Sequence, residues 1–169
     1  MIINELESNP LEPVTLDEVK DYLGYAHDVA DNDDVLNRHI RASRQMLEKV
    51  LGIYITQRQV SFTPHPGPVG MPSPVVDIRS FKAKDAEGED VDVTGYEITG
   101  EEFYRVLHWK LPEGCTDPLV TAMVGFAICP EDIRASIVQL VKARYDRAEL
   151  APVLGDAVAS LYHYMRVGL

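Results

Sequence analysis

The side chains best suited to catalysis or metal binding are dispersed along the chain. The 169 residues include five histidines and two cysteines, yet no HExxH pattern and no Cys/His pair at the spacing of a zinc site occurs. The patterns that hold a nucleophile or a phosphate, G-x-S-x-G, the P-loop and G-x-G-x-x-G, are also missing. We therefore predict no catalytic residue, no metal and no cofactor. The histidines, interpreted as ordinary surface or boundary residues, are His27, His39, His65, His108 and His163.

One acidic segment resembles the start of a calcium-binding loop. Asp31-Asn32-Asp33 has the right opening, but such a loop needs an oxygen ligand at its fifth position, Gly at its sixth and Glu at its twelfth. Those positions hold Val35, Leu36 and Ala42. The calcium interpretation therefore fails, and capping of a helix explains the acidic residues.

The two cysteines, Cys115 and Cys129, bear on the compartment and on one alternative function. The first seven residues show no basic segment followed by an apolar one, so no secretory signal is predicted and free thiols are favoured over a disulfide. No sequence signal joins either thiol to a base. An unrecognised active site around Cys115 or around residues 64–74 stays open, because many active sites leave no motif.

Charge is distributed in blocks along a chain whose net charge is −11. Residues 1–36 carry −9, residues 37–84 carry +6, residues 85–102 carry −8, and residues 103–169 balance. A broad nucleic-acid-binding surface is disfavoured, because phosphate contacts need clustered Lys and Arg. Two interpretations remain: solvated loops on an ordinary surface, or basic and acidic patches that meet on neighbouring copies of the chain.

Three helices have clear start and stop signals. Thr15 and Glu18 form a capping box, and Gly24 ends the helix that follows. A long helix with apolar residues at three- and four-residue steps ends at Gly52. Pro130 begins the last one, because the N–H that proline lacks is unpaired at a first helical position. These helices are predicted over about residues 15–23, 34–51 and 130–149.

The region 55–127 changes to strand-forming patterns. Five prolines within residues 64–74 exclude regular structure there and predict a long loop. Residues 85–89, with Gly88, predict an acidic hairpin turn. The apolar run 119–127 predicts the last strand. The expected fold class is α+β, a helical core with an inserted antiparallel β-sheet or hairpin, in a single domain over residues 1–150.

Residues 151–169 are predicted to form a C-terminal tail or a short helix. Pro152 and Gly155 predict a break after the preceding helix. Leu161, Tyr162 and Met165 then fall on one side of the remaining segment. Apolar residues at a chain end are explained by docking on a partner.

Three arginines follow the polar side of the long helix. Arg38, Arg41 and Arg44 recur at three-residue steps. They are interpreted either as a solvated face or as a contact ridge for an acidic partner.

In order and spacing, these segments resemble the head–tail connector (adaptor, or head-completion) family of tailed bacteriophages, which also occurs in prophages and gene transfer particles. The resemblance covers about residues 13–150. The matching segments are PVTLDEVKDYL (13–23), DDVL (33–36), IRAS (40–43) with the run to LG (51–52), ITQ (55–57), MPSPV (71–75), VTAMVGF (120–126) and PEDIRASI (130–137). The end of the chain shares a looser Leu-Tyr-x-Tyr-x-Arg pattern, which adds Tyr162, Tyr164 and Arg166 to the candidate interface residues.

The resemblance implies a structural virion protein without catalytic residues or cofactor. Such proteins form an oligomeric ring, here expected to be a dodecamer, between the portal of the capsid and a tail-side connector or stopper protein. The ring extends the DNA channel, through which DNA passes without sequence-specific binding, and no membrane is involved. The expected location is the head–tail junction of a virion assembled in the bacterial host cytoplasm.

Two other functions stay open at this stage. One is a small enzyme or DNA-packaging accessory protein with an unrecognised site. The other is a generic interaction domain of similar α+β build. Perturbed ionisable residues gathered in a pocket would favour the enzyme.

Overall fold

The protein combines helices with two antiparallel sheets, which confirms the predicted α+β class. The computed structural model describes residues 3–6, 11–28, 30–101 and 103–165. The chain divides into two compact units, a β unit and a helical unit. The β unit comprises the described parts of Met1–Pro10 and Thr56–Ala127, and the helical unit those of Leu11–Ile55 and Ile128–Val167. The single domain over residues 1–150 stays a prediction.

The first two helices of the helical unit have the predicted ends. Helix α1 (Leu16–Leu23) starts at the capping box, in which the Glu18 N–H donates to Thr15 Oγ1 at 3.2 Å and the Thr15 N–H donates to the Glu18 carboxylate at 2.7 Å. Helix α2 (Asp33–Leu51) ends at Gly52, whose φ of 69° suits a residue without a side chain.

The C-terminal helices depart from the prediction. Helix α3 (Glu131–Tyr145) follows Pro130 but ends four residues before the expected position 149. Helix α4 (Leu150–Ser160) then runs through Pro152 and Gly155, so the break predicted there is wrong. Pro152 lies in the first turn of α4, where the N–H it lacks needs no intrahelical partner, and a helical glycine costs only about 1 kcal/mol relative to Ala.

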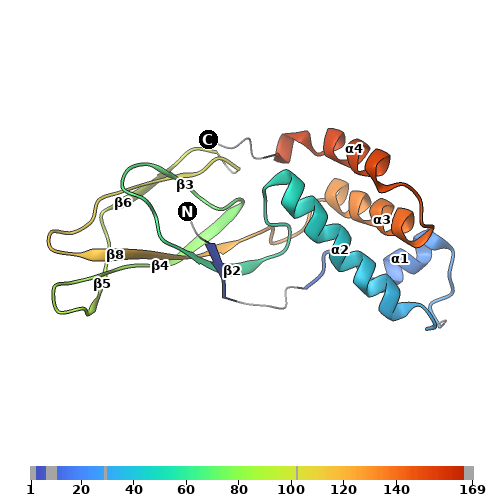
Figure 1. Cartoon of the computed structure of the whole chain (residues 1–169), viewed down its shortest axis with the longest axis horizontal. Coiled ribbons are helices and arrows are strands. Elements are labelled where there is room, and N and C mark those ends of the chain that lie inside the picture. Colours follow the sequence, from blue (N-terminus) through green and yellow to red (C-terminus); the bar gives the residue numbers. More distant parts are fainter. Residues whose placement is uncertain (1–2, 7–10, 29, 102, 166–169) are drawn as a thin grey trace. The chain divides into compact units, whose positions relative to one another are not determined.

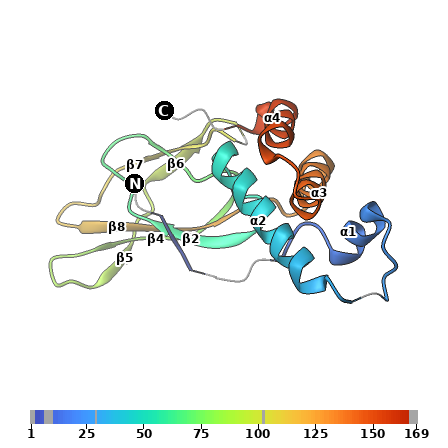
Figure 2. The ribbon, with the colours of Figure 1, turned by 45° about the vertical axis from the view of Figure 1, so that its right-hand side comes forward.

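Four helices enclose the core of the helical unit. Helix α3 packs against α1, α2 and α4 (Figures 1 and 2). Full burial of each large aliphatic side chain contributes about 1.5–3 kcal/mol, so this shared core holds the unit together. Its side chains that are at most 2% exposed include Val19, Leu36, Ile40, Leu47, Leu51, Ile133, Ile137, Leu140 and Val141.

The larger sheet of the β unit is built around its last strand. The strand order is β1-β2-β8-β4-β5, and every neighbouring pair is antiparallel. Strand β8 pairs with β2, where Val60 lies opposite Ala122, and with β4, where Phe81 lies opposite Val120. Gly125, with a φ of 95°, follows β8, so this strand ends earlier than predicted. The strands are β1 (Ile3–Glu5), β2 (Arg58–Phe62), β4 (Val75–Lys84), β5 (Asp90–Asp92) and β8 (Thr116–Val124).

A second, three-stranded sheet of order β3-β7-β6 corrects two predictions. Strand β3 (Val69–Gly70) lies inside the proline-rich segment expected to lack regular structure. Strand β6 (Tyr96–Thr99), expected to continue the β4–β5 hairpin, pairs instead with β7 (Val106–Trp109) (Figure 2). Residues 93–95 are irregular and interrupt the hairpin, which frees β6 for another partner.

Aromatic side chains join the two sheets of the β unit. The ring of Phe81, from β4, lies 5.6 Å from that of Tyr96 and 5.5 Å from that of Trp109, between ring centroids. These distances fall in the range of favourable aromatic pairs. The core of this unit also contains Val60, Phe62, Leu107, Val120, Ala122 and Val124, all fully buried.

Candidate functional site: charged surfaces and the C-terminal segment

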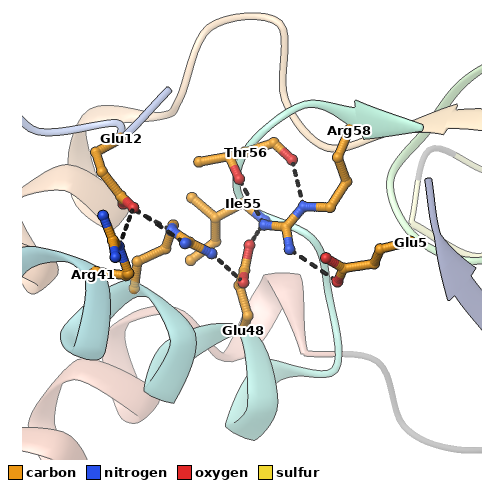
Figure 3. Close-up of polar contacts among 8 residues, drawn as sticks. Glu5, Glu12, Arg41, Glu48, Ile55, Thr56 and Arg58 are labelled. Carbon is orange, nitrogen blue, oxygen red and sulfur yellow. Dashed lines mark hydrogen bonds and ion pairs between the residues drawn. The ribbon is translucent and has the colours of Figure 1, made fainter. Parts of the chain in front are cut away.

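The three arginines singled out on α2 do not share one environment. Arg38 and Arg41 are exposed. Arg38 Nε donates to the Asp34 carbonyl oxygen at 3.2 Å, and Arg41 Nε lies 3.9 Å from Glu12 (Figure 3). Arg44, in contrast, is only 3% exposed. The expectation of a single ridge of three exposed arginines is therefore not met.

Arg44 is held in the interior of the helical unit by two carboxylates. Its Nε and Nη2 donate to Glu12 at 2.8 and 3.1 Å, and its Nη1 donates to Glu48 at 2.7 Å. Glu48 also accepts the Ile55 N–H at 2.9 Å, so it fixes the chain beyond α2 (Figure 3). Burial by itself would lower the pKa of Arg44, but the hydrogen bonds and charges of Glu12 and Glu48 outweigh it and raise the pKa. The Arg44 guanidinium is thus a buried, charged group that links Glu12 to Glu48 within the helical unit.

Helical geometry explains why Arg44 is buried. At about 100° per residue, three-residue steps drift by about 60° each, so Arg38 and Arg44 point about 120° apart. Arg44 lies four residues after Ile40 and three before Leu47, which puts it on the buried stripe of α2. That spacing was the sequence signal for its burial.

A different set of residues forms the exposed basic surface of α2. Lys49, which the sequence analysis did not single out, is exposed and makes no ion pair among the described residues. Steps of three, four and four residues lead along the exposed side of α2 to Lys49. We call this surface the basic stripe; it consists of Arg38, Arg41, Gln45 and Lys49.

The turn between β4 and β5 is acidic and is held by hydrogen bonds to Asp85. Asp85 Oδ1 accepts the N–H groups of Glu87 at 3.0 Å and Glu89 at 2.8 Å, and Gly88 has a φ of 86°. Glu87 and Glu89 take part in these bonds through their backbone N–H groups, and both residues are exposed. The hairpin turn predicted from the sequence is confirmed.

The carboxylates of this hairpin differ in how far they are neutralised. Asp90 lies 2.6 Å from Lys84 Nζ, and this hydrogen bond and charge lower the pKa of Asp90. Exposed Glu87, Glu89 and Asp92 make no ion pair among the described residues. We call these three residues the acidic tip.

The C-terminal candidate interface residues also differ in their surroundings. Tyr162, 65% exposed, lies in the short 3-10 helix η1 (Tyr162–Tyr164). Tyr164 Oη donates to Asp132 Oδ1 at 3.2 Å, and His163 Nε2 lies 3.5 Å from Asp132 Oδ2, so η1 docks on the start of α3. Arg166 lies outside the described residues. The assignment of Tyr162, Tyr164 and Arg166 to a partner interface stays a prediction.

A second buried arginine, which the sequence analysis missed, anchors the N-terminal strand of the β unit. Arg58, 5% exposed, donates to Thr56 Oγ1 at 2.6 Å and to Glu5 at 3.1 Å (Figure 3). Glu5 belongs to β1, which pairs with β2 at the edge of the sheet. This cluster therefore secures the edge strand and does not point to chemistry.

The described residues provide little for catalysis. They contain no group of three or more His, Cys, Asp or Glu side chains placed to hold a metal ion. Cys115 and Cys129 are both free thiols. Burial, with smaller contributions from Asp132 and Glu131, raises the pKa of Cys129 to about 12. Its thiol is protonated at neutral pH and is a poor nucleophile.

No helix in the described part of the chain is both long and apolar enough to pass through a bilayer.

Comparison with known proteins finds solved structures with a similar fold. No protein-family model and no curated protein matches the sequence. Among solved structures, a chain in the neck of the empty gene transfer agent (GTA) particle, computed with C6 symmetry, matches with a TM-score of 0.77 and 18% identity. Chains in the virion of the native GTA particle and in its neck, computed with C12 symmetry, match with TM-scores of 0.76 and 19% identity.

Each of these matches covers 100% of this chain and 97% of the other chain. The fold of the whole chain is therefore one found in the neck of GTA particles. At the level of the fold, the resemblance to head–tail connectors is confirmed.

Proposed function

We propose that the protein is a structural subunit of the neck of a phage or phage-like particle. The observation that carries this proposal is the match in fold, which covers 100% of this chain and 97% of the other chain and not a shared motif alone. Neither the thiols nor the histidines form a site that favours an enzyme. The basic stripe and the acidic tip suit a protein that works through contacts with other chains.

The subunit forms a closed ring of twelve copies in this proposal. The C6 and C12 symmetries of the matching neck structures support a ring. Cyclic rings are built from heterologous contacts, in which two different patches of one chain meet those of its neighbours. The ring lies between the portal and a tail-side connector or stopper, extends the channel for DNA and provides a docking platform. The C-terminal residues Tyr162, Tyr164 and Arg166 are proposed to contribute to partner contacts.

The mass of the purified protein tests this proposal. Light scattering over a range of protein and salt concentrations should detect a species many times heavier than the 18.9 kDa chain. If the free chain stays monomeric, binding to portal particles is measured next, because a subunit can require the portal to assemble. A chain that neither self-associates nor binds portal particles would refute the proposal.

A further inference from the structure

Two surfaces of the chain carry opposite charges that the described residues do not neutralise. Of the three cations in the basic stripe on α2, only Arg41 makes an ion pair among the described residues. Its partner Glu12 lies 3.9 Å away and is already bonded to Arg44. Among the described residues, Arg38 donates a hydrogen bond to a carbonyl oxygen of its own helix, and neither Arg38 nor Lys49 makes an ion pair. The stripe is therefore able to receive an acidic partner.

The acidic tip has complementary properties. Its three carboxylates project from a hairpin whose shape depends on Asp85 and Gly88, not on the tip residues themselves. Two lysines of β4 lie near the tip: Lys84 is engaged with Asp90 at 2.6 Å, and Lys82, opposite Asp92 in the strand register, lies 4.0 Å from Asp90. The tip is thus a negatively charged part of a hydrogen-bonded hairpin, and its three carboxylates make no ion pair among the described residues.

We infer that the acidic tip of one copy binds the basic stripe of the next copy around the ring. This inference rests on the proposed function, because a ring needs two different and complementary patches on each chain. Electrostatic complementarity of this kind selects the partner and fixes its register more than it adds affinity. The occupant of the stripe is accordingly a second copy of this chain.

Charge reversal on either surface tests the contact. The variant Arg38→Glu/Lys49→Glu reverses the stripe, and the variant Glu87→Lys/Glu89→Lys reverses the tip. Arg41, Asp85 and Asp90 are left intact to preserve the neighbouring structure. Each variant alone should weaken subunit association about tenfold or more at low salt, because like charges then face each other. The effect should shrink at 1 M salt, where the Debye length is about 3 Å.

Mixing the two variants gives the most specific result. In a 1:1 mixture, the reversed stripe of one variant meets the reversed tip of the other, and the unchanged surfaces meet as well. Association should return to near the wild-type level, with both variants in equal number in each ring by native mass spectrometry. Recovery on mixing also shows that each variant is folded.

A matched control separates this contact from a general effect of net charge. Lys110→Glu/Arg147→Glu makes the same charge change as the stripe reversal at exposed residues outside both surfaces, and it should assemble like the wild type. All variants are assayed as free chains and on portal particles.

The outcomes distinguish the contact from the proposed function. If the wild type assembles and the reversals behave like the control, or mixing fails to restore assembly, the contact is refuted while the neck function stands. If the wild type neither self-associates nor binds portal particles, the proposed function is refuted, and the contact with it.

Discussion

Replacing Arg44 by Met tests whether this residue is a structural centre of the helical unit and not part of a binding surface. The substitution keeps an unbranched side chain that fills the space of the aliphatic stem but removes the charge. It deletes three charge-assisted hydrogen bonds, two to Glu12 and one to Glu48. The two carboxylates are then left beside each other without their shared cation.

The expected loss of stability follows from the burial of these partners. Removing one member of a buried ion pair typically costs about 3–5 kcal/mol, because the remaining charge is uncompensated. The side chains of Glu12 and Glu48 keep 24% and 12% exposure, so water retains some access. We therefore expect the lower end of that range, about 3 kcal/mol, which lowers Tm by about 6–12 °C for a protein of this size.

Urea unfolding followed by far-UV circular dichroism measures this loss, with Arg41→Met as the matched control. Arg41 is on the same helix, but its side chain is 61% exposed and lies 3.9 Å from Glu12. Its replacement should cost less than about 0.5 kcal/mol. In the Arg44→Met background, Glu12→Gln should cost less than it does in the wild type, since its cation is gone. Equal losses for Arg44→Met and Arg41→Met would refute the reasoning.

Further predictions concern two glycines, one histidine and one cysteine. Gly125→Ala should destabilise the protein by more than about 2 kcal/mol in urea unfolding, because the φ of this residue is positive and the added Cβ would lie too close to the Thr56 carbonyl oxygen. Gly155 lies within α4, and a Cβ added there meets no other atom. Gly155→Ala should therefore stabilise the protein by about 0.5–1 kcal/mol. The hydrogen bond and charge of Asp21 raise the pKa of His27, so this pair stabilises the fold fully below pH 6.5 and its contribution fades as the pH rises through the raised pKa. Asp21→Asn should return the His27 titration toward its ordinary value by NMR, and an unchanged titration would exclude this cause. Cys129, with its pKa raised to about 12, should be alkylated on the order of 10³-fold more slowly at pH 8 than an unperturbed thiol. Rapid labelling found by peptide mass spectrometry would contradict the raised pKa of this half-buried thiol.

The sequence predicted those features that depend on neighbouring residues. The capping box at Thr15 and the glycine ends of α1 and α2 are local signals, and each is present as expected. The acidic turn at Asp85 is local too. The rest depends on residues far apart in the chain. Nothing near β8 indicates that β2 and β4 flank it, since β2 is separated from it by more than fifty residues.

The environment of Arg44 was predictable only in part. Arg44 is buried because its helical spacing from Ile40 and Leu47 places it on the apolar stripe, a signal available in the sequence. Its partner Glu12 comes from an irregular segment 32 residues away, which no local pattern predicts. The continuation of α4 through Pro152 shows that the position of a proline within a helix matters more than its presence.

The central claim is that this chain is a ring subunit of the neck. Cryo-electron microscopy of particles purified from the cells that produce the protein tests it most directly. The account predicts a ring of twelve copies between portal and tail, with density that fits both the β unit and the helical unit of each copy. Purified particles that lack the chain, or a neck whose density is fully explained by other proteins, would contradict it.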